Sequence, residues 1–155
     1  MSVSVQQEDF DPGAETAALS HGRCDVGAVA TFVGLVRTAN DGSGVSAMTL
    51  EHYPGMTERA LEEIANEARS RWHLLGLRVI HRYGRLEPGE RIVFVGTAAA
   101  HRGDAFAACE FVMDYLKTRA PFWKREETPE GARWVDARES DDSAAARWDD
   151  VEMRR

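Results

Sequence analysis

The sequence contains only two cysteines in 155 residues, Cys24 and Cys109, and their spacing fits neither a metal site nor a CxxC redox motif. This scarcity argues against a disulfide framework and against a zinc-bound domain. No apolar run approaches the roughly 18 residues that a membrane-spanning helix needs, and the N-terminus lacks a signal-peptide pattern. These absences predict a protein that works in a reduced, cytoplasmic compartment.

Several catalytic motifs are also missing. The chain has no GxGxxG, no Walker A sequence, no HExxH and no GxSxG, so the common dinucleotide, nucleotide, zinc-protease and serine-hydrolase sites are not predicted. Its net charge of -7 argues against nucleic acid or an acidic membrane as the main partner. A hydrophobic content of 43% with 29% charged residues is typical of an ordinary globular protein.

The order of the predicted elements indicates one α+β domain over residues 1–155, with an N-terminal segment at 1–24 and a polar tail at 140–155. We expect only one helical turn in the tail, around Ala144–Trp148. Apolar periodicity predicts two main helices, one opened by Pro54-Gly55 and one over 102–119. The predicted strands, short at the N-terminus, lie at 3–5, 26–36, 45–53, 77–83, 91–97, 122–127 and 132–136. A short helix is expected at 14–20.

Two segments carry specific structural predictions. The uncharged run at 26–36 is typical of a buried strand, and the Gly- and Asn-containing segment at 38–44 is typical of a loop. Pro121 cannot continue the second main helix, because its ring clashes with the preceding turn and it has no N–H to donate.

The richest chemical signal is the segment Lys117–Arg125, which has four cations and no acid inside an acidic protein. Because clustered cations repel one another, an anionic ligand would explain them. Lys117 also lies where a cation satisfies helix-terminal carbonyls, so capping alone could account for it. Lys124 lies beyond Pro121, so sequence spacing does not say how far apart the two lysines are. If they converge with Arg102, repulsion would lower the pKa of one lysine and provide a neutral amine.

Three further residues are candidates for anion binding. His101 and Arg102 lie where a strand gives way to a helix N-terminus, which favours anions, although a solvated helix start is the simpler interpretation. Arg37 follows the long apolar strand, where it could equally be solvated. Phe122 and Trp123 are more typical of packing than of a stacking platform, and Cys109 is expected in the core.

At these residues the sequence resembles a known family, the large (catalytic) subunit of molybdopterin synthase. The resemblance extends from about Gly27 to Glu139. It rests on five blocks in order, at 30–37, 50–56, 100–102, 117–124 and 133–138.

The resemblance implies a fold of the α/β-hammerhead type and a sulfurtransferase activity. Members of the family convert cyclic pyranopterin monophosphate into molybdopterin by installing a dithiolene, in molybdenum cofactor biosynthesis. The sulfur arrives as a thiocarboxylate on the C-terminal Gly-Gly of a small ubiquitin-like subunit. The resemblance further implies a homodimer within a heterotetramer. No metal or other cofactor is expected, and no cysteine nucleophile is needed.

The resemblance also assigns roles to individual residues. Lys117 would act at the end of the thiocarboxylate tail and Lys124 would support it, with the division of roles between them open. Arg37, His101, Arg102 and Arg138 would bind the substrate phosphate or pterin, and which protomer contributes Arg138 stays open. Phe32 and Met113 would line the channel for the Gly-Gly tail.

Two other functions compete with this one. A non-catalytic module that binds a ubiquitin-like protein would keep the tail channel without an anion pocket, but the five cations Arg37, His101, Arg102, Lys117 and Lys124 argue against it. A nucleotide or nucleic-acid binder built on Lys117–Arg125 is disfavoured by the net charge.

Overall fold

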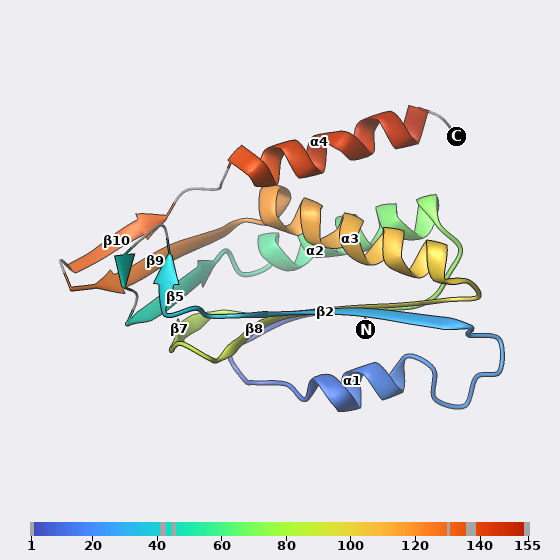
Figure 1. Cartoon of the computed structure of the whole chain (residues 1–155), viewed down its shortest axis with the longest axis horizontal. Coiled ribbons are helices and arrows are strands. Elements are labelled where there is room, and N and C mark those ends of the chain that lie inside the picture. Colours follow the sequence, from blue (N-terminus) through green and yellow to red (C-terminus); the bar gives the residue numbers. More distant parts are fainter. Residues whose placement is uncertain (1, 41–42, 45, 130, 136–138, 154–155) are drawn as a thin grey trace.

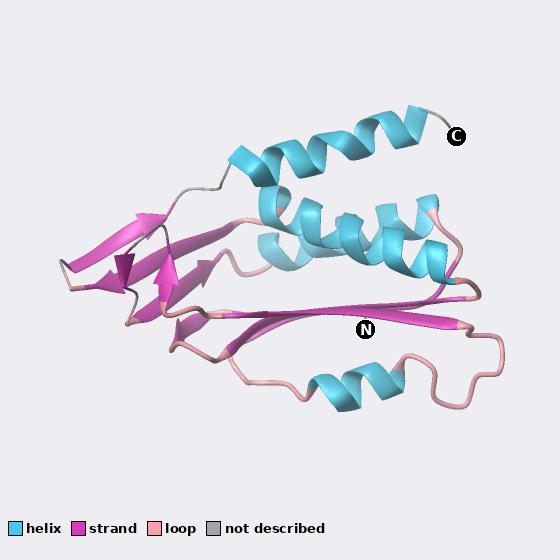
Figure 2. Cartoon of the chain, in the orientation of Figure 1, coloured by secondary structure: helices cyan, strands magenta, loops and turns pink. Residues whose placement is uncertain are grey.

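Two four-stranded sheets, a two-stranded ribbon and four helices make up the described part of the molecule, seen in a computed structural model that describes residues 2–40, 43–44, 46–129, 131–135 and 139–153 (Figures 1 and 2). The four helices are α1 (Pro12–Ala18), α2 (Met56–Arg71), α3 (Arg102–Arg119) and α4 (Glu139–Met153). The strands are β1 (Val3–Gln6), β2 (Ala28–Leu35), β3 (Ala39–Asn40), β4 (Ser43–Gly44), β5 (Ala47–His52), β6 (Leu74–Arg82), β7 (Gly84–Leu86), β8 (Arg91–Ala99), β9 (Phe122–Thr128) and β10 (Gly131–Val135). The α+β prediction is confirmed.

The larger sheet has the strand order β1-β6-β8-β2, in which β1 is parallel to β6 and the other pairs are antiparallel. The second sheet, β10-β9-β5-β7, is antiparallel throughout, and β3 pairs with β4 as a separate ribbon. Helices α2 and α3 cover one face of the larger sheet, α1 lies on the other, and α4 lies over α3 (Figure 1).

The main core lies between the larger sheet and the two long helices. Side chains at three- and four-residue steps bury one face of each helix: Leu61, Ile64, Ala65 and Ala68 in α2, and Ala108, Phe111, Val112 and Tyr115 in α3. On the opposite face Gly96 lets Leu19 approach, because an added Cβ would lie 2.6 Å from Leu19 Cδ1.

Helix α3 has the boundaries that the sequence predicts. Its last turn carries Lys117 and Arg119, and Ala120 then leaves the helix with extended dihedrals (φ -84°, ψ 129°). The residue before a proline disfavours the helical region, so Pro121 directs the chain out of the helix and into β9.

Three predictions about the elements need correction. Strand β2 is at the edge of its sheet, with Val29, Phe32 and Leu35 37%, 40% and 53% exposed, because β8 takes the central place and leaves one side of β2 unpaired. Part of the predicted loop at 38–44 forms the β3–β4 ribbon, and β7 was not foreseen. The polar tail, predicted as one turn, is the 15-residue helix α4, because Trp148 packs into the main core.

Within the described residues, no helix is long and apolar enough to cross a membrane.

Candidate functional site

Lys117 lies at the point where α3 meets the second sheet. The turn after the helix is held by Thr57, whose fully buried hydroxyl donates to the carbonyl of Pro121 at 3.1 Å and accepts from the backbone N–H of Tyr53 at 3.0 Å. These bonds join the N-terminus of α2 to the start of β9. Thr57 therefore fixes the turn that follows α3 to the segment that precedes α2.

Strand β9 places Lys124 from the other direction. β9 pairs with β5 so that Leu50 lies opposite Lys124 and His52 lies opposite Phe122. Successive side chains of a strand alternate between its faces, so Phe122 and Lys124 share one face. Trp123 lies on the other face, where its ring packs edge-on against Tyr53 at 4.3 Å.

His81, on β6, lies near both lysines. Its side chain is buried, its ring stacks on Phe122 at a centroid distance of 3.8 Å, and its Nδ1 lies 2.8 Å from the carbonyl oxygen of Arg82. Burial lowers the pKa of His81 to about 3; the Arg82 carbonyl opposes this, and the charges of Lys117, Lys124 and His52 add to it.

The structure thus brings the two lysines toward the same buried group, which the sequence left open. The positive charges of Lys117 and Lys124 act on the same buried ring, although a helix end and a proline separate the two residues in the chain. Charges that act on a buried group are screened by salt much less than exposed charges are. Lys117, Lys124 and His81 therefore form one cluster, which we call the lysine site.

His52 extends the lysine site toward α2. Its half-buried ring lies 4.1 Å from the ring of Tyr83, and its Nε2 lies 3.9 Å from Oε1 of Glu58. The other carboxylate oxygen of Glu58 accepts from the N–H of Gly55 at 2.8 Å, at the start of α2. His52, the last residue of β5 in the second sheet, thus lies close to the start of α2.

Arg37 lies at the same end of the larger sheet as His81. Gly34, Val93 and His81 occupy one row across β2, β8 and β6, and the exposed Arg37 follows shortly after Gly34. The end of β2 and the end of α3 also lie on the same side of the molecule in Figure 1.

His101 and Arg102 lie at the opposite end. They begin α3, fifteen residues before Lys117, and a helix of that length rises about 22 Å. Both are exposed, and His101 makes no side-chain capping bond. The idea that Arg102 converges with the two lysines within one chain is therefore wrong, because a straight helix holds them apart.

Two of the remaining predicted residues lie along α3 and β2, and one lies outside the described residues. Met113 is one helical turn before Lys117 and is only 9% exposed, whereas Phe32 is 40% exposed on the edge strand. Ala30, which shares a face of β2 with Phe32, belongs to the same core cluster as Met113. Arg138 lies outside the described residues.

Comparison with known proteins identifies the family. The model of the MoaE protein family matches residues 5–119, which is more than half of the chain. The molybdopterin synthase catalytic subunit of Pseudomonas aeruginosa is 63% identical over 150 residues, covering 97% of this chain and all of that protein. The chain belongs to the MoaE family.

Solved structures agree with this assignment. The MoaE molybdopterin biosynthesis protein from Burkholderia ambifaria is 59% identical with a TM-score of 0.81, covering 95% of this chain and 97% of that one. A complex of subunits 1 and 2 of molybdopterin-converting factor from Helicobacter pylori contains a chain only 19% identical, with a TM-score of 0.73, covering 89% and 92%. That more distant likeness shows the shared fold.

Membership of the MoaE family confirms the function that the resemblance predicted. The chain is an enzyme of molybdenum cofactor biosynthesis, acting as the catalytic subunit of a molybdopterin synthase. Of the three functions considered from the sequence, the non-catalytic module and the nucleic-acid binder are not supported.

The cysteines of this MoaE protein do not contribute to the lysine site. Cys109 is buried as predicted, and burial, with a smaller effect of Glu110, raises the pKa of its thiol to about 11. Cys24 is exposed on the segment after α1. Among the residues that the structure describes, no group of His, Cys, Asp and Glu side chains could hold a metal ion.

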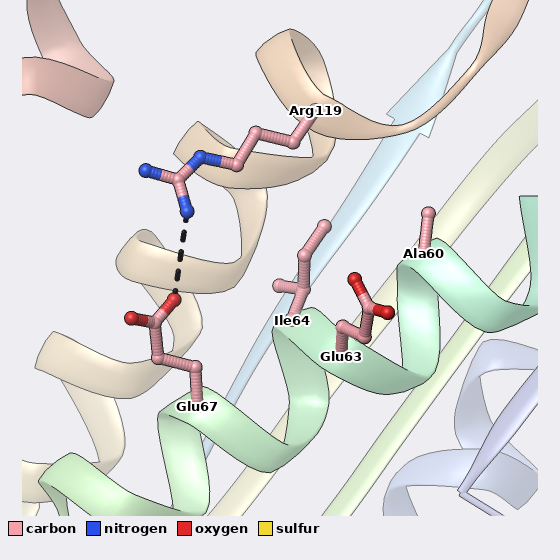
Figure 3. Close-up of a pocket in the computed structure, with 5 residues that line it drawn as sticks. All are labelled: Ala60, Glu63, Ile64, Glu67 and Arg119. Carbon is pink, nitrogen blue, oxygen red and sulfur yellow. Dashed lines mark ion pairs between the residues drawn. The ribbon is translucent and has the colours of Figure 1, made fainter.

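A pocket of about 310 Å³ opens between α2 and the end of α3, but it contains none of the predicted site residues. It is lined by Ala60, Glu63, Ile64, Glu67 and Arg119. Figure 3 shows Arg119 reaching across to Glu67, and the two charged groups lie 3.6 Å apart. Its two carboxylates make this pocket a poor match for anionic reactants.

Sequence reasoning missed His81 and His52. The available signal was weak: His81 shares a strand face with Val79, where an apolar residue is expected, and a histidine there usually has a structural role. Its importance depends on which charges surround it, and these come from α3, β5 and β9.

Proposed function

We propose that this protein transfers sulfur from the C-terminal thiocarboxylate of a small ubiquitin-like subunit to cyclic pyranopterin monophosphate, and that the lysine site carries the chemistry. The observation that carries the proposal is that Lys117 on α3 and Lys124 on β9 both lie near one buried imidazole, that of His81, whose ring stacks on Phe122 two residues before Lys124. Both reactants bring negative charge, one as a thiocarboxylate and the other as a phosphate. A site that holds two cations together suits both reactants.

Lys117 is the residue that we place beside the end of the sulfur-carrying tail. Lys117 lies in the last turn of α3 and Met113 lies one turn earlier, so the two share one helix face. The incoming tail of the small subunit would contact this face. There Lys117 would transfer a proton or stabilise the charge of the intermediate. Lys124 would stabilise the same charge from β9.

The tail itself would approach past β2 and α3. Phe32, exposed on an unpaired strand edge, and Met113, at the surface of the core, supply the apolar walls that a Gly-Gly tail needs. The solved Helicobacter pylori complex of two molybdopterin-converting factor subunits supports a small subunit as the partner.

The substrate phosphate and pterin would be bound by Arg37, His101, Arg102 and Arg138. Arg37 lies on the side of the lysine site, but about 22 Å of helix separates Arg102 from Lys117. We therefore propose that a second copy of the chain supplies His101 and Arg102, in the homodimer at the centre of a heterotetramer.

The first test is the Lys117→Ala variant, reconstituted with the thiocarboxylated small subunit and cyclic pyranopterin monophosphate. We expect molybdopterin formation to fall by about a hundredfold or more, because a positioned proton-transfer group contributes on that scale. The measurement is single-turnover molybdopterin yield.

Arg119→Ala is the matched control, because Arg119 is a cation in the same helical turn that pairs with Glu67. This variant should keep nearly normal turnover. Near-normal turnover of Lys117→Ala would remove Lys117 from the mechanism, and equal losses in both variants would show that only the net charge matters.

A further inference from the structure

The turn that carries His101 and Arg102 is held against the start of β2. Gly27, the residue before β2, donates its N–H to the carbonyl of Ala99 at 3.0 Å. Ala99 ends β8, and His101 follows two residues later as the N-cap of α3. Figure 1 shows the start of β2 and the start of α3 at the same end of the molecule. The entry to β2 is therefore in direct contact with the turn between β8 and α3.

This contact leaves no room for a side chain at position 27. A Cβ added to Gly27 would lie far inside 3.0 Å of the carbonyl oxygen of Ala100, and 3.1 Å from its carbonyl carbon. Both atoms belong to the backbone, so no side-chain rotation can relieve the overlap. Gly27 is not one of the glycines with a positive φ. Close approach of two backbone segments, rather than an unusual conformation, therefore requires the glycine.

The turn is fixed at both of its ends. Ala99 is fully buried in the sheet, and Ala105 in the first turn of α3 is 1% exposed. The buried hydroxyl of Thr97 donates to the carbonyl of Ala105 at 2.7 Å, which ties the start of α3 to β8. His101 and Arg102 lie between these fixed points and are exposed. A displacement forced on the turn would therefore be taken up by the residues that carry the two predicted substrate contacts.

We propose that Gly27 is a positioning residue for His101 and Arg102, and that it acts by leaving space for the Ala100 carbonyl. The inference rests on the proposed function, because it takes His101 and Arg102 as residues that bind the substrate phosphate or pterin. Gly27 contacts no reactant and acts through the peptide group that joins Ala100 to His101. A Cβ at position 27 would push this group by about 1 Å, and a misplacement of that size can cost about a hundredfold in rate.

The test is the Gly27→Ala variant in the reconstituted two-subunit enzyme, with the concentration of cyclic pyranopterin monophosphate varied. We expect its KM to rise by about tenfold to a hundredfold, because a displaced guanidinium loses the geometry of a bidentate phosphate contact. The kcat value should change far less, because Lys117 lies at the other end of α3. For the same reason the Kd for the small subunit should stay at the wild-type value.

Gly103→Ala is the matched control. Gly103 follows Arg102 in the same turn, and a Cβ added there would meet nothing within 4 Å. Because alanine also favours a helix more than glycine does, this variant should keep the wild-type KM and a stable fold. Equal KM values for Gly27→Ala and Gly103→Ala would overturn the proposal. Loss of the folded state in Gly27→Ala, seen by circular dichroism, would overturn it too, because Gly27 would then serve the fold as a whole.

A second readout does not need activity. Calorimetric titration of cyclic pyranopterin monophosphate into the enzyme, assembled with a small subunit that ends in an ordinary carboxylate, measures substrate binding without sulfur transfer. The Kd should rise in Gly27→Ala by about the same factor as the KM, and should not change in Gly103→Ala. Arg102→Ala separates the two proposals. Normal substrate binding by Arg102→Ala would count against the proposed function, whereas weak binding by Arg102→Ala with normal binding by Gly27→Ala would refute only the role of Gly27.

Discussion

At the scale of single residues, burial decides the chemistry of His81. The ring is uncharged because desolvation opposes its protonation, and the nearby lysine charges act in the same direction. The exposed Lys117 comes from α3 and the half-buried Lys124 from β9, so the lysine site combines a buried neutral group with cations closer to solvent. Anions can reach those cations, whereas the ring stays shielded.

This burial predicts how stability depends on pH. The unfolded histidine has a pKa near 6.5 and the folded one a pKa of about 3, so the unfolded state binds more protons between those values. Acidification from about pH 6.5 toward pH 3 should therefore destabilise the wild type by about 1.4 kcal/mol per pH unit through this residue. Urea unfolding at a series of pH values measures the slope.

In His81→Gln this part of the slope should disappear, because glutamine does not titrate. Above pH 6.5 the wild type and the variant should depend on pH in the same way. Parallel curves below pH 6 would show that His81 takes up its proton in the folded protein.

At the scale of elements, α4 is fastened to α3 by a small set of contacts. Trp148 packs edge-on against Trp72 and Phe111 at 5.6 Å each, and its Nε1 donates to Asp114 at 2.7 Å. The buried Arg71 donates to the carbonyl of Trp148 at 2.8 Å. These contacts come from α2 and α3, so α4 completes the outer side of the helical layer (Figure 2).

Trp148→Ala should therefore destabilise the whole protein. Loss of a buried tryptophan costs about 3–5 kcal/mol, and the hydrogen bond from its Nε1 to Asp114 is lost as well. Chemical denaturation followed by circular dichroism gives the change. Asp149→Ala, an exposed neighbour on the same helix, should change stability by less than about 0.5 kcal/mol.

At the scale of the whole molecule, the length of α3 dictates how the predicted site residues can be combined. Lys117 and Lys124 gather at one end of the molecule and His101 and Arg102 at the other. One copy of the chain cannot bring both groups to the same substrate. A symmetric pair can, because in such a pair each end of one copy can meet the other end of its partner.

Coexpression of Lys117→Ala with Arg102→Ala tests this arrangement. Random pairing makes half of the dimers mixed, and each mixed dimer regains one intact site of two, so activity should recover to about a quarter of the wild type. Neither variant alone should approach that value. The measurement is molybdopterin formation by the copurified mixture.

Lys117→Ala coexpressed with Lys124→Ala provides the control. Both lysines belong to the same end of one chain, so every site in a mixed dimer lacks one of them and no recovery is expected. Recovery in this pair, or none in the first pair, would contradict the shared site.

The sequence by itself determined the local features of this protein. The periodicity of α3 and the position of Pro121 predicted the helix from Arg102 to Arg119, since both depend on neighbours along the chain. The ordered motif blocks likewise indicated the family, and the family comparisons confirmed it. For Lys117 and Lys124, however, the sequence provided two positions without a distance.

Only the tertiary structure decided what depends on long-range pairing and burial. Pairing of β9 with β5 and the stacking of Phe122 on His81 brought the two lysine charges to one ring, and the place of β2 at a sheet edge exposed Phe32. Strand order and desolvation arise from contacts between residues far apart in the chain, so no local pattern encodes them. The regular helical geometry that made α3 predictable also gives it a fixed rise per residue, and this rise keeps Arg102 far from Lys117 at the other end of the helix.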